Sequence, residues 1–115
     1  MTQEHIQVVA SAGKSDGQRV LTCRGPITMV TLAPLRLALQ AENCPALILV
    51  LSDVSHMDSA GLGLLVQLHA SFQRTGRRLA LAGVNERIRT SLDVTGLSHV
   101  LTLYSTRADA EQALA

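Results

Sequence analysis

The chain has 115 residues, 47% of them apolar and 17% charged, with a formal net charge of +1. These values predict one folded domain over residues 1–115 and argue against intrinsic disorder. The near-neutral charge and the presence of only two aromatic side chains, Phe72 and Tyr104, argue against nucleic-acid binding. No apolar run approaches the ~20 residues of a membrane-spanning helix, and Met1–His5 has no basic segment leading into an apolar one. We therefore expect a cytoplasmic protein that does not insert into a membrane.

The first part of the chain predicts an antiparallel hairpin followed by a helix. Residues 5–10 and 18–24 are short segments rich in β-branched residues, and the loop between them is polar and contains glycine. Gly25 and Pro26 end the second strand. Residues 31–41 then place leucines at helical spacing, with Pro34 in the first turn, where proline is tolerated.

The rest of the chain alternates between strands and helices. Residues 46–51 form a continuous apolar run of strand length, which is typical of a central strand covered on both faces. The same patterns predict strands at 79–83 and 100–104, and helices at 60–74, 86–95 and from Thr106 to Ala115. This order predicts an α/β fold with about four helices and a mixed sheet whose centre is mainly parallel.

Cys23 and Cys44 are the only cysteines of the chain. Two widely separated cysteines make neither a disulfide framework nor a zinc site. Because both lie in or beside apolar stretches, we expect them to be buried free thiols.

The stretch from Ser52 to Gly63 joins the predicted central strand to the next helix. Such loops lie at the carboxyl edge of an open α/β sheet, where these folds usually place their sites. Asp58 and Ser59 stand where a helix cap is expected, and capping is the simplest interpretation. The second interpretation starts from Gly61 and Gly63, each of which costs up to ~1 kcal/mol in a helix relative to alanine. Both glycines would leave bare backbone around Ser59 that another protein can approach, and the helix N-terminus would tolerate a phosphate there.

Enzymatic interpretations of this loop fit its residues less well. A dinucleotide-binding loop would need a third glycine where Val66 stands. A nucleophile elbow around Ser59 would need a leading glycine where Met57 stands. His56 and Asp58 would be half of a metal site, but no second ligand pair follows. We therefore expect no catalytic residue, no metal and no cofactor.

Half of the ten basic residues lie within 16 residues of sequence: Arg74, Arg77, Arg78, Arg87 and Arg89. They are interpreted as solvated helix ends and turns. The alternative is a docking patch for an acidic protein surface.

The segment Val54-Ser55-His56-Met57-Asp58-Ser59-Ala60-Gly61-Leu62-Gly63 resembles the signature loop of STAS domains, above all that of single-domain bacterial anti-sigma factor antagonists. The likeness extends to the opening hairpin, to Gly76 before a strand and to Thr95-Gly96-Leu97 after the third predicted helix. It implies a STAS-like fold and a protein that exchanges binding partners, and it argues against catalysis.

In that family, the serine that matches Ser59 is phosphorylated by an anti-sigma factor that is also an ATP-dependent serine kinase, and a serine phosphatase reverses the modification. The resemblance therefore implies that the chain binds the anti-sigma factor when Ser59 is unmodified, so that a sigma factor is released. It implies a partner-binding surface made of His56, Asp58, Ser59, Ala60, Gly61, Leu62 and Gly63.

The chain departs from the usual pattern of the family in two places. Members often carry acidic residues in a Gly-Glu-Leu-Asp stretch after the second strand, where this chain has Gly25-Pro26-Ile27-Thr28. They also often have an aspartate near the end of the central strand, at the position of Val50. These differences leave an alternative open, in which the chain is an unswitched STAS subunit of a larger complex such as a lipid-transport ABC system.

Overall fold

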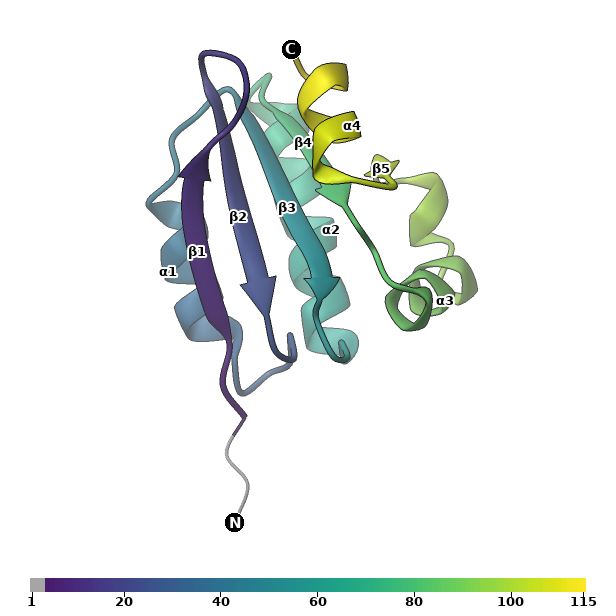
Figure 1. Ribbon diagram of the computed structural model, residues 1–115. Coiled ribbons are helices and arrows are strands. Elements are labelled where there is room, and N and C mark those ends of the chain that lie inside the picture. Colours follow the sequence, from purple (N-terminus) through teal and green to yellow (C-terminus); the bar gives the residue numbers. More distant parts are fainter. Residues whose placement is uncertain (1–3) are drawn as a thin grey trace.

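The computed structural model describes residues 4–115 (Figure 1). Its strands are Gln7–Ala12 (β1), Gln18–Arg24 (β2), Ala46–Asp53 (β3), Arg78–Ala82 (β4) and Leu103–Tyr104 (β5). Its α-helices are Leu32–Gln40 (α1), Ser59–Arg74 (α2), Glu86–Val94 (α3) and Arg107–Ala113 (α4), with a short 3-10 helix at Leu97–His99. This order confirms the predicted alternation of strands and helices after an opening hairpin.

The strands form one mixed sheet in the order β1-β2-β3-β4-β5. β1 pairs with β2 in an antiparallel ladder, and every other neighbouring pair is parallel. The predicted parallel centre is therefore confirmed. Because β2, β3 and β4 run in the same direction, their carboxyl ends meet at one edge of the sheet, the lower edge in Figure 1.

Helices cover both faces of the sheet, but unequally. α1, α2 and α3 pack on one face over a large apolar core that includes Leu21, Leu49 and Leu81. α4 lies on the opposite face over a smaller core that includes Val20 and Ile48 (Figure 1). β3 is thus covered on both sides, as its unbroken apolar sequence predicts.

The first strand lies two residues later than predicted, over 7–12 and not 5–10. The N–H of Gly13 donates to the carbonyl of Gln18 at 2.9 Å, so the antiparallel ladder continues as far as Ala12. The reversal needs only residues 13–17, with Gly17 in the left-handed region at φ 81°. The prediction ended the strand before Ser11 because Ser11 is polar. A polar residue fits this strand nevertheless, because one side of β1 is exposed.

The last predicted strand, 100–104, is only partly correct. Residues 97–99 form a 3-10 helix, and the N–H groups of Val100 and Leu101 both donate to the carbonyl of Leu97. These bonds hold the segment in a turn, so β5 consists of Leu103 and Tyr104 alone. The apolar side chain of Leu101 is buried in the larger core nevertheless.

Both cysteines are buried free thiols, as predicted. Burial raises the pKa of Cys23 to about 12, because a thiolate loses its hydration in the core. Among the described helices, none combines the length and apolar character needed to cross a bilayer.

Candidate functional site

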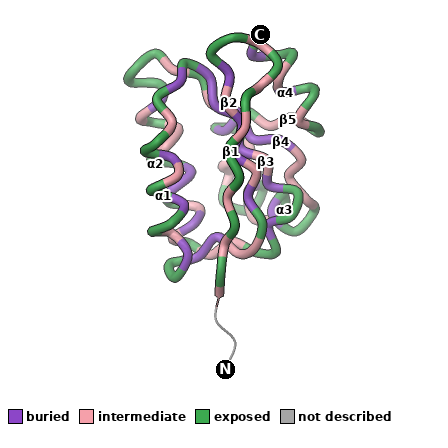
Figure 2. Tube along the Cα trace, turned by 60° about the vertical axis from the view of Figure 1, so that its left-hand side comes forward, coloured by how far each residue is buried: buried purple, intermediate pink, exposed green. Residues whose placement is uncertain are grey.

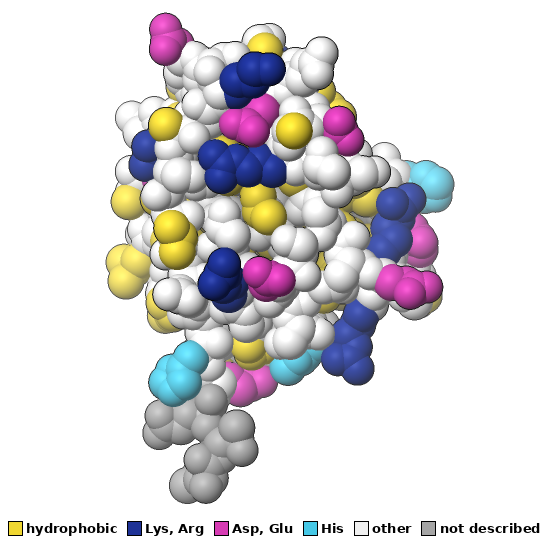
Figure 3. All heavy atoms as spheres, viewed as in Figure 1, with side chains coloured by type: hydrophobic (Ala, Val, Ile, Leu, Met, Phe, Trp, Pro, Cys, Tyr) yellow, Lys and Arg dark blue, Asp and Glu magenta, His cyan; other side chains and the backbone are white. Residues whose placement is uncertain are grey.

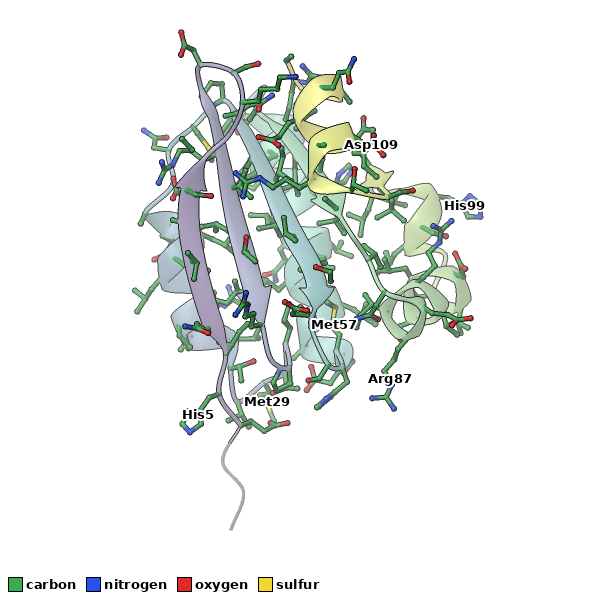
Figure 4. All side chains as sticks on the ribbon, in the orientation of Figure 1. His5, Met29, Met57, Arg87, His99 and Asp109 are labelled. Carbon is green, nitrogen blue, oxygen red and sulfur yellow. The ribbon has the colours of Figure 1, made fainter. Side chains whose placement is uncertain are left out.

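The loop that carries Ser59 runs from Asp53 at the end of β3 to the start of α2, at the carboxyl edge of the sheet. It lies against the segment that joins β2 to α1, with an isolated parallel bridge between Ile27 and Met57. Figure 4 shows Met29 and Met57 at this same end of the molecule. The predicted location is therefore confirmed, and a second segment contributes to it.

Asp58 is the residue that caps α2. Its side chain accepts a hydrogen bond from the N–H of Gly61 at 2.9 Å, the usual geometry of a helix cap. The other carboxylate oxygen accepts from the N–H of Met29 at 3.0 Å. The Gly61 N–H, followed by that of Met29, lowers the pKa of Asp58 because these donors favour the charged form. One carboxylate thus both starts the helix and joins it to the β2–α1 segment.

Ser59 is the first residue of α2, and it is exposed. Because Asp58 caps the helix, the Ser59 hydroxyl is not needed as the cap. It forms no hydrogen bond with another side chain among the described residues. The first N–H groups of a helix carry partial positive charge, so an anion on this hydroxyl is compatible with the helix. The Ser59 side chain is therefore exposed and not engaged by a described side chain, which is the geometry that the second interpretation of the loop requires.

Gly61 and Gly63, in the first turns of α2, differ in the space around them. A Cβ on Gly61 would lie 2.5 Å from the carbonyl oxygen of Ile27 and 2.5 Å from Cγ of Met57. Gly61 is buried, so the expectation of bare, approachable backbone is wrong there: the β2–α1 segment already covers it. A Cβ on Gly63 would meet nothing within 4 Å, and Gly63 is exposed. Only Gly63 offers bare backbone to another molecule.

Met29 and Val30 are part of this surface, although their positions in the sequence did not indicate it. Their exposed fractions are 76% and 66%, unusually high for large apolar side chains. The backbone here is held by two threonines, since the N–H of Thr28 donates to the Thr31 hydroxyl and that of Val30 to the Thr28 hydroxyl. The signal in the sequence was an apolar pair between two threonines, outside any helical or strand pattern.

His56 is paired with a carboxylate and does not contact Ser59. Its Nε2 lies 3.3 Å from Glu4, whose other carboxylate oxygen accepts from the hydroxyl of Thr28 at 3.0 Å. Across residues 4–115, no group of three or more His, Cys, Asp or Glu side chains is arranged to hold a metal ion. Neither the metal site nor a Ser–His nucleophile is assembled by the described residues.

The remaining predicted contact residues are divided between surface and interior. Ala60 and Leu62 are half-buried, and Leu62 packs against the larger core. The exposed part of the site therefore consists of His56, Ser59, Gly63, Met29 and Val30, with Asp58 half-buried among them.

The arginine-rich segment does not form one docking patch. Arg77 stacks on Phe72, 4.0 Å from the ring centroid, and donates to the carbonyls of Glu42 and Cys44. Arg87 lies on α3, at the other end of β4 (Figure 4), and donates to the carbonyl of Ser55. Arg87 is exposed near the start of a helix, as the interpretation as solvated helix ends and turns predicts, but Arg77 is half-buried and serves backbone carbonyls, so that interpretation is wrong for Arg77.

The family model described as STAS domain matches residues 9–110 of the chain. The chain belongs to the STAS domain family. The fold expected from the resemblance is confirmed, with a hairpin, a mainly parallel centre and four α-helices.

Three similar proteins carry related names. An anti-sigma-B factor antagonist of Bacillus subtilis is 35% identical over 78 residues, 68% of this chain and 67% of that protein. An anti-sigma F factor antagonist of Paenibacillus polymyxa is 29% identical over 73 residues, 64% of this chain and 62% of that protein. The crystal structure of an anti-sigma factor antagonist from Mycobacterium paratuberculosis superposes with a TM-score of 0.79 at 29% identity, covering 95% of this chain and 93% of that one. The matches span 67% and 62% of the length of these two curated relatives, about two thirds of each.

Proposed function

We propose that the chain is an anti-sigma factor antagonist that acts by exchanging partners in the bacterial cytoplasm. With Ser59 unmodified, it binds an anti-sigma factor that is also a serine kinase, and with Ser59 phosphorylated it releases that protein. A serine phosphatase restores the binding form. The observation that carries the proposal is the exposed Ser59 hydroxyl at the start of α2, which no neighbouring side chain holds.

The surroundings of Ser59 explain how a phosphate would act. Apart from His56, which is paired with Glu4, the exposed residues of the site besides Ser59 are small or apolar, namely Gly63, Met29 and Val30. The Asp58 carboxylate is engaged by backbone N–H groups. A phosphoserine adds a charge of about −1.5 to −2 to this surface, and a partner that buries it must remove its hydration. The helix N-terminus favours the same anion, so the modification prevents binding without unfolding the domain.

The neighbourhood of Ser59 also supports the proposal where the sequence departs from the family pattern. Thr28 stands where an acid is common, but its hydroxyl donates to the carboxylate of Glu4. An acidic group is therefore present beside residue 28, supplied by the N-terminal segment.

The test uses the anti-sigma factor kinase that co-purifies with the chain, incubated with it and Mg-ATP. We expect one phosphate, on Ser59, which Ser59→Ala abolishes. Ser55→Ala is the matched control, because Ser55 is an exposed serine of the same loop. Phosphate on any other residue would contradict the assignment.

Binding of the same partner separates charge from size at this position. Ser59→Asp is expected to weaken binding, while Ser59→Asn, of similar size and without charge, retains more of it. The alternative of an unswitched subunit in a larger transport complex rests on Pro26 and Val50, where acids are usual. Stable co-purification with a transporter ATPase that Ser59→Asp leaves unchanged would favour that alternative.

A further inference from the structure

The outer edge of β1 is an open, uncharged strand edge. β1 is the terminal strand of the sheet, and its six residues, Gln7–Ala12, include no charged residue and no proline. In Figure 2, where the left-hand side of Figure 1 is turned forward, β1 runs down the centre with none of the described chain in front of it. Soluble proteins usually protect such edges with charges, prolines or a covering element. Along the described chain, this edge has one such protection, at its end: Arg107 of α4 donates to the carbonyl of Ala12 at 3.1 Å.

The alternation of backbone hydrogen bonds identifies which groups face that edge. The N–H of Gly13 donates to the carbonyl of Gln18, and hydrogen-bonded residues alternate along an antiparallel strand. Every second residue before Gly13, namely Ser11, Val9 and Gln7, therefore directs its N–H and C=O groups toward β2. The backbone groups of the intervening residues, Ile6, Val8, Ala10 and Ala12, then point outward. Of these, the carbonyl of Ala12 accepts a hydrogen bond from Arg107, and its second lone pair remains for a further donor.

α1, which lies beside this edge, is apolar on its exposed side as well. Its only charged residue, Arg36, lines a groove with α2 together with Gln40. On the side turned away from α2, Leu37 has an exposed fraction of 68%. The exposed residues along this side of the α1 segment are Val30, Ala33, Pro34, Leu37 and Ala41. Figure 3 shows hydrophobic side chains along the margin where β1 and α1 lie.

We propose that a second copy of this chain occupies this edge, with the two β1 strands paired antiparallel about a two-fold axis through Val9. Hydrogen-bonded pairs between the two copies can form only between residues whose backbone groups point outward, and in β1 these are the residues with even numbers. An even-numbered residue of one copy must therefore lie opposite an even-numbered residue of the other. A register centred on Val9 satisfies this rule, because it places Val8 opposite Ala10 of the second copy and Ile6 opposite Ala12. One chain surface thereby supplies both halves of a self-complementary interface.

The same register matches side chains and charges. Val9, half exposed in the single chain, meets Val9 of the second copy in a close cross-strand pair. Glu4, which also binds its own Thr28 and His56, comes level with Lys14 of the second copy, so unlike charges flank both ends. Each α1 contacts its own β1, so the two helices lie on the same face of the joined sheet, one on each side of the junction.

This pairing leaves Ser59 itself free, although Val30 and Glu4 belong both to the pairing surface and to the surroundings of Ser59. Ser59 begins α2, whereas the pairing uses β1 and the side of α1 turned away from α2. The two proposals can fail separately, because they are tested by different measurements. Dimer formation is measured as the mass of the species in solution, and the proposed function is measured as phosphorylation of Ser59 and binding of the partner.

Sedimentation velocity over a concentration series tests the proposal. We expect a species of twice the 12.3 kDa chain mass. Val9→Lys places two like charges opposite each other and should raise the dimer dissociation constant about 100-fold or more. Ala10→Pro removes an outward N–H that β2 does not use, and should also favour the monomer. Val94→Lys is the matched control, because Val94 is 82% exposed on α3 and should leave the dimer intact.

Far-UV circular dichroism and thermal melting of each variant establish that it is folded. A wild-type chain that stays monomeric at about 300 µM would overturn the proposal. So would a dimer that Val9→Lys and Ala10→Pro leave unchanged. If the chain is monomeric and Val9→Lys instead abolishes anti-sigma factor binding, the edge belongs to that partner and not to a second copy.

Discussion

Replacing Gly61 and Gly63 one at a time with alanine is expected to shift the stability of the domain in opposite directions. Both residues lie in α2, two positions apart, so the gain in helix propensity is the same, about 1 kcal/mol. At Gly63 the new Cβ enters open space, and the full gain should appear. At Gly61 it would lie 2.5 Å from the backbone oxygen of Ile27, which the helix cannot displace as it would a flexible side chain.

Forcing that Cβ into place requires α2 and the β2–α1 segment to separate. The separation stretches the hydrogen bond from the Asp58 N–H to the Ile27 carbonyl, 3.2 Å long, and the bond from the Met29 N–H to the Asp58 carboxylate. Overpacking costs about 1–3 kcal/mol, and a backbone obstacle puts Gly61→Ala in the upper part of that range, at about 2–3 kcal/mol. The net effect after a propensity gain of about 1 kcal/mol is a loss of about 1–2 kcal/mol.

The assay is thermal and urea unfolding of the three proteins, followed by circular dichroism. For a domain of this size, 1 kcal/mol corresponds to roughly 4 °C in Tm. Gly63→Ala should therefore melt about 4 °C higher than the wild type, and Gly61→Ala about 4–8 °C lower. Two variants that shift Tm in the same direction would refute the reasoning from close approach. Reduced partner binding by the more stable Gly63→Ala would mark Gly63 as part of the contact.

Three further predictions concern a cap, a thiol and a buried arginine contact. The pKa of Asp58 is lowered on folding from its usual 3.8, so its contribution to stability is present above that value and is lost as the pH falls through the folded-state pKa. Asp58→Asn keeps an acceptor for the helix and should lose less stability between about pH 4.5 and about pH 2.5 in urea titrations; an unchanged slope would contradict this. Because burial raises the pKa of Cys23 to about 12, neither Cys23 nor the buried Cys44 should react with a thiol reagent at about pH 8 until the domain unfolds. Arg77→Met should cost about 2 kcal/mol in urea unfolding, since it removes the bonds to the carbonyls of Glu42 and Cys44, whereas the exposed Arg74→Met should stay within about 0.5 kcal/mol.

The helix starts were predictable because their causes are local. Asn85 accepts from the N–H of Ile88, and Thr106 from the N–H of Asp109, each within three residues of sequence. The left-handed Gly76 and Gly96 after α2 and α3 follow from the same short-range geometry. The limits of β1 and β5 were not predictable in this way, because strand pairing depends on a partner elsewhere in the chain.

The loop before α2 was recognisable from its sequence, and so was Ser59 as its accessible residue. Its partner segment was not. Met29 reaches the site through a hydrogen bond to Asp58, 29 residues later in the chain. Apolar residues in a loop give no periodic pattern in the sequence. The exposure of Met29 and Val30 beside the Ser59 loop is therefore established only by the tertiary structure, in which β2 and β3 lie side by side.

The sequence by itself determined the order of elements, the parallel centre of the sheet and the position of the serine loop. These properties follow from hydrophobic periodicity, capping residues and turn residues, all of which act over a few residues. The tertiary structure decided why Gly61 is glycine, that Asp58 also binds Met29, which apolar side chains surround Ser59 and which strand edge is open. Each of these depends on contacts between segments distant in sequence, and the register and stacking of the sheet establish those contacts only when the whole chain has folded.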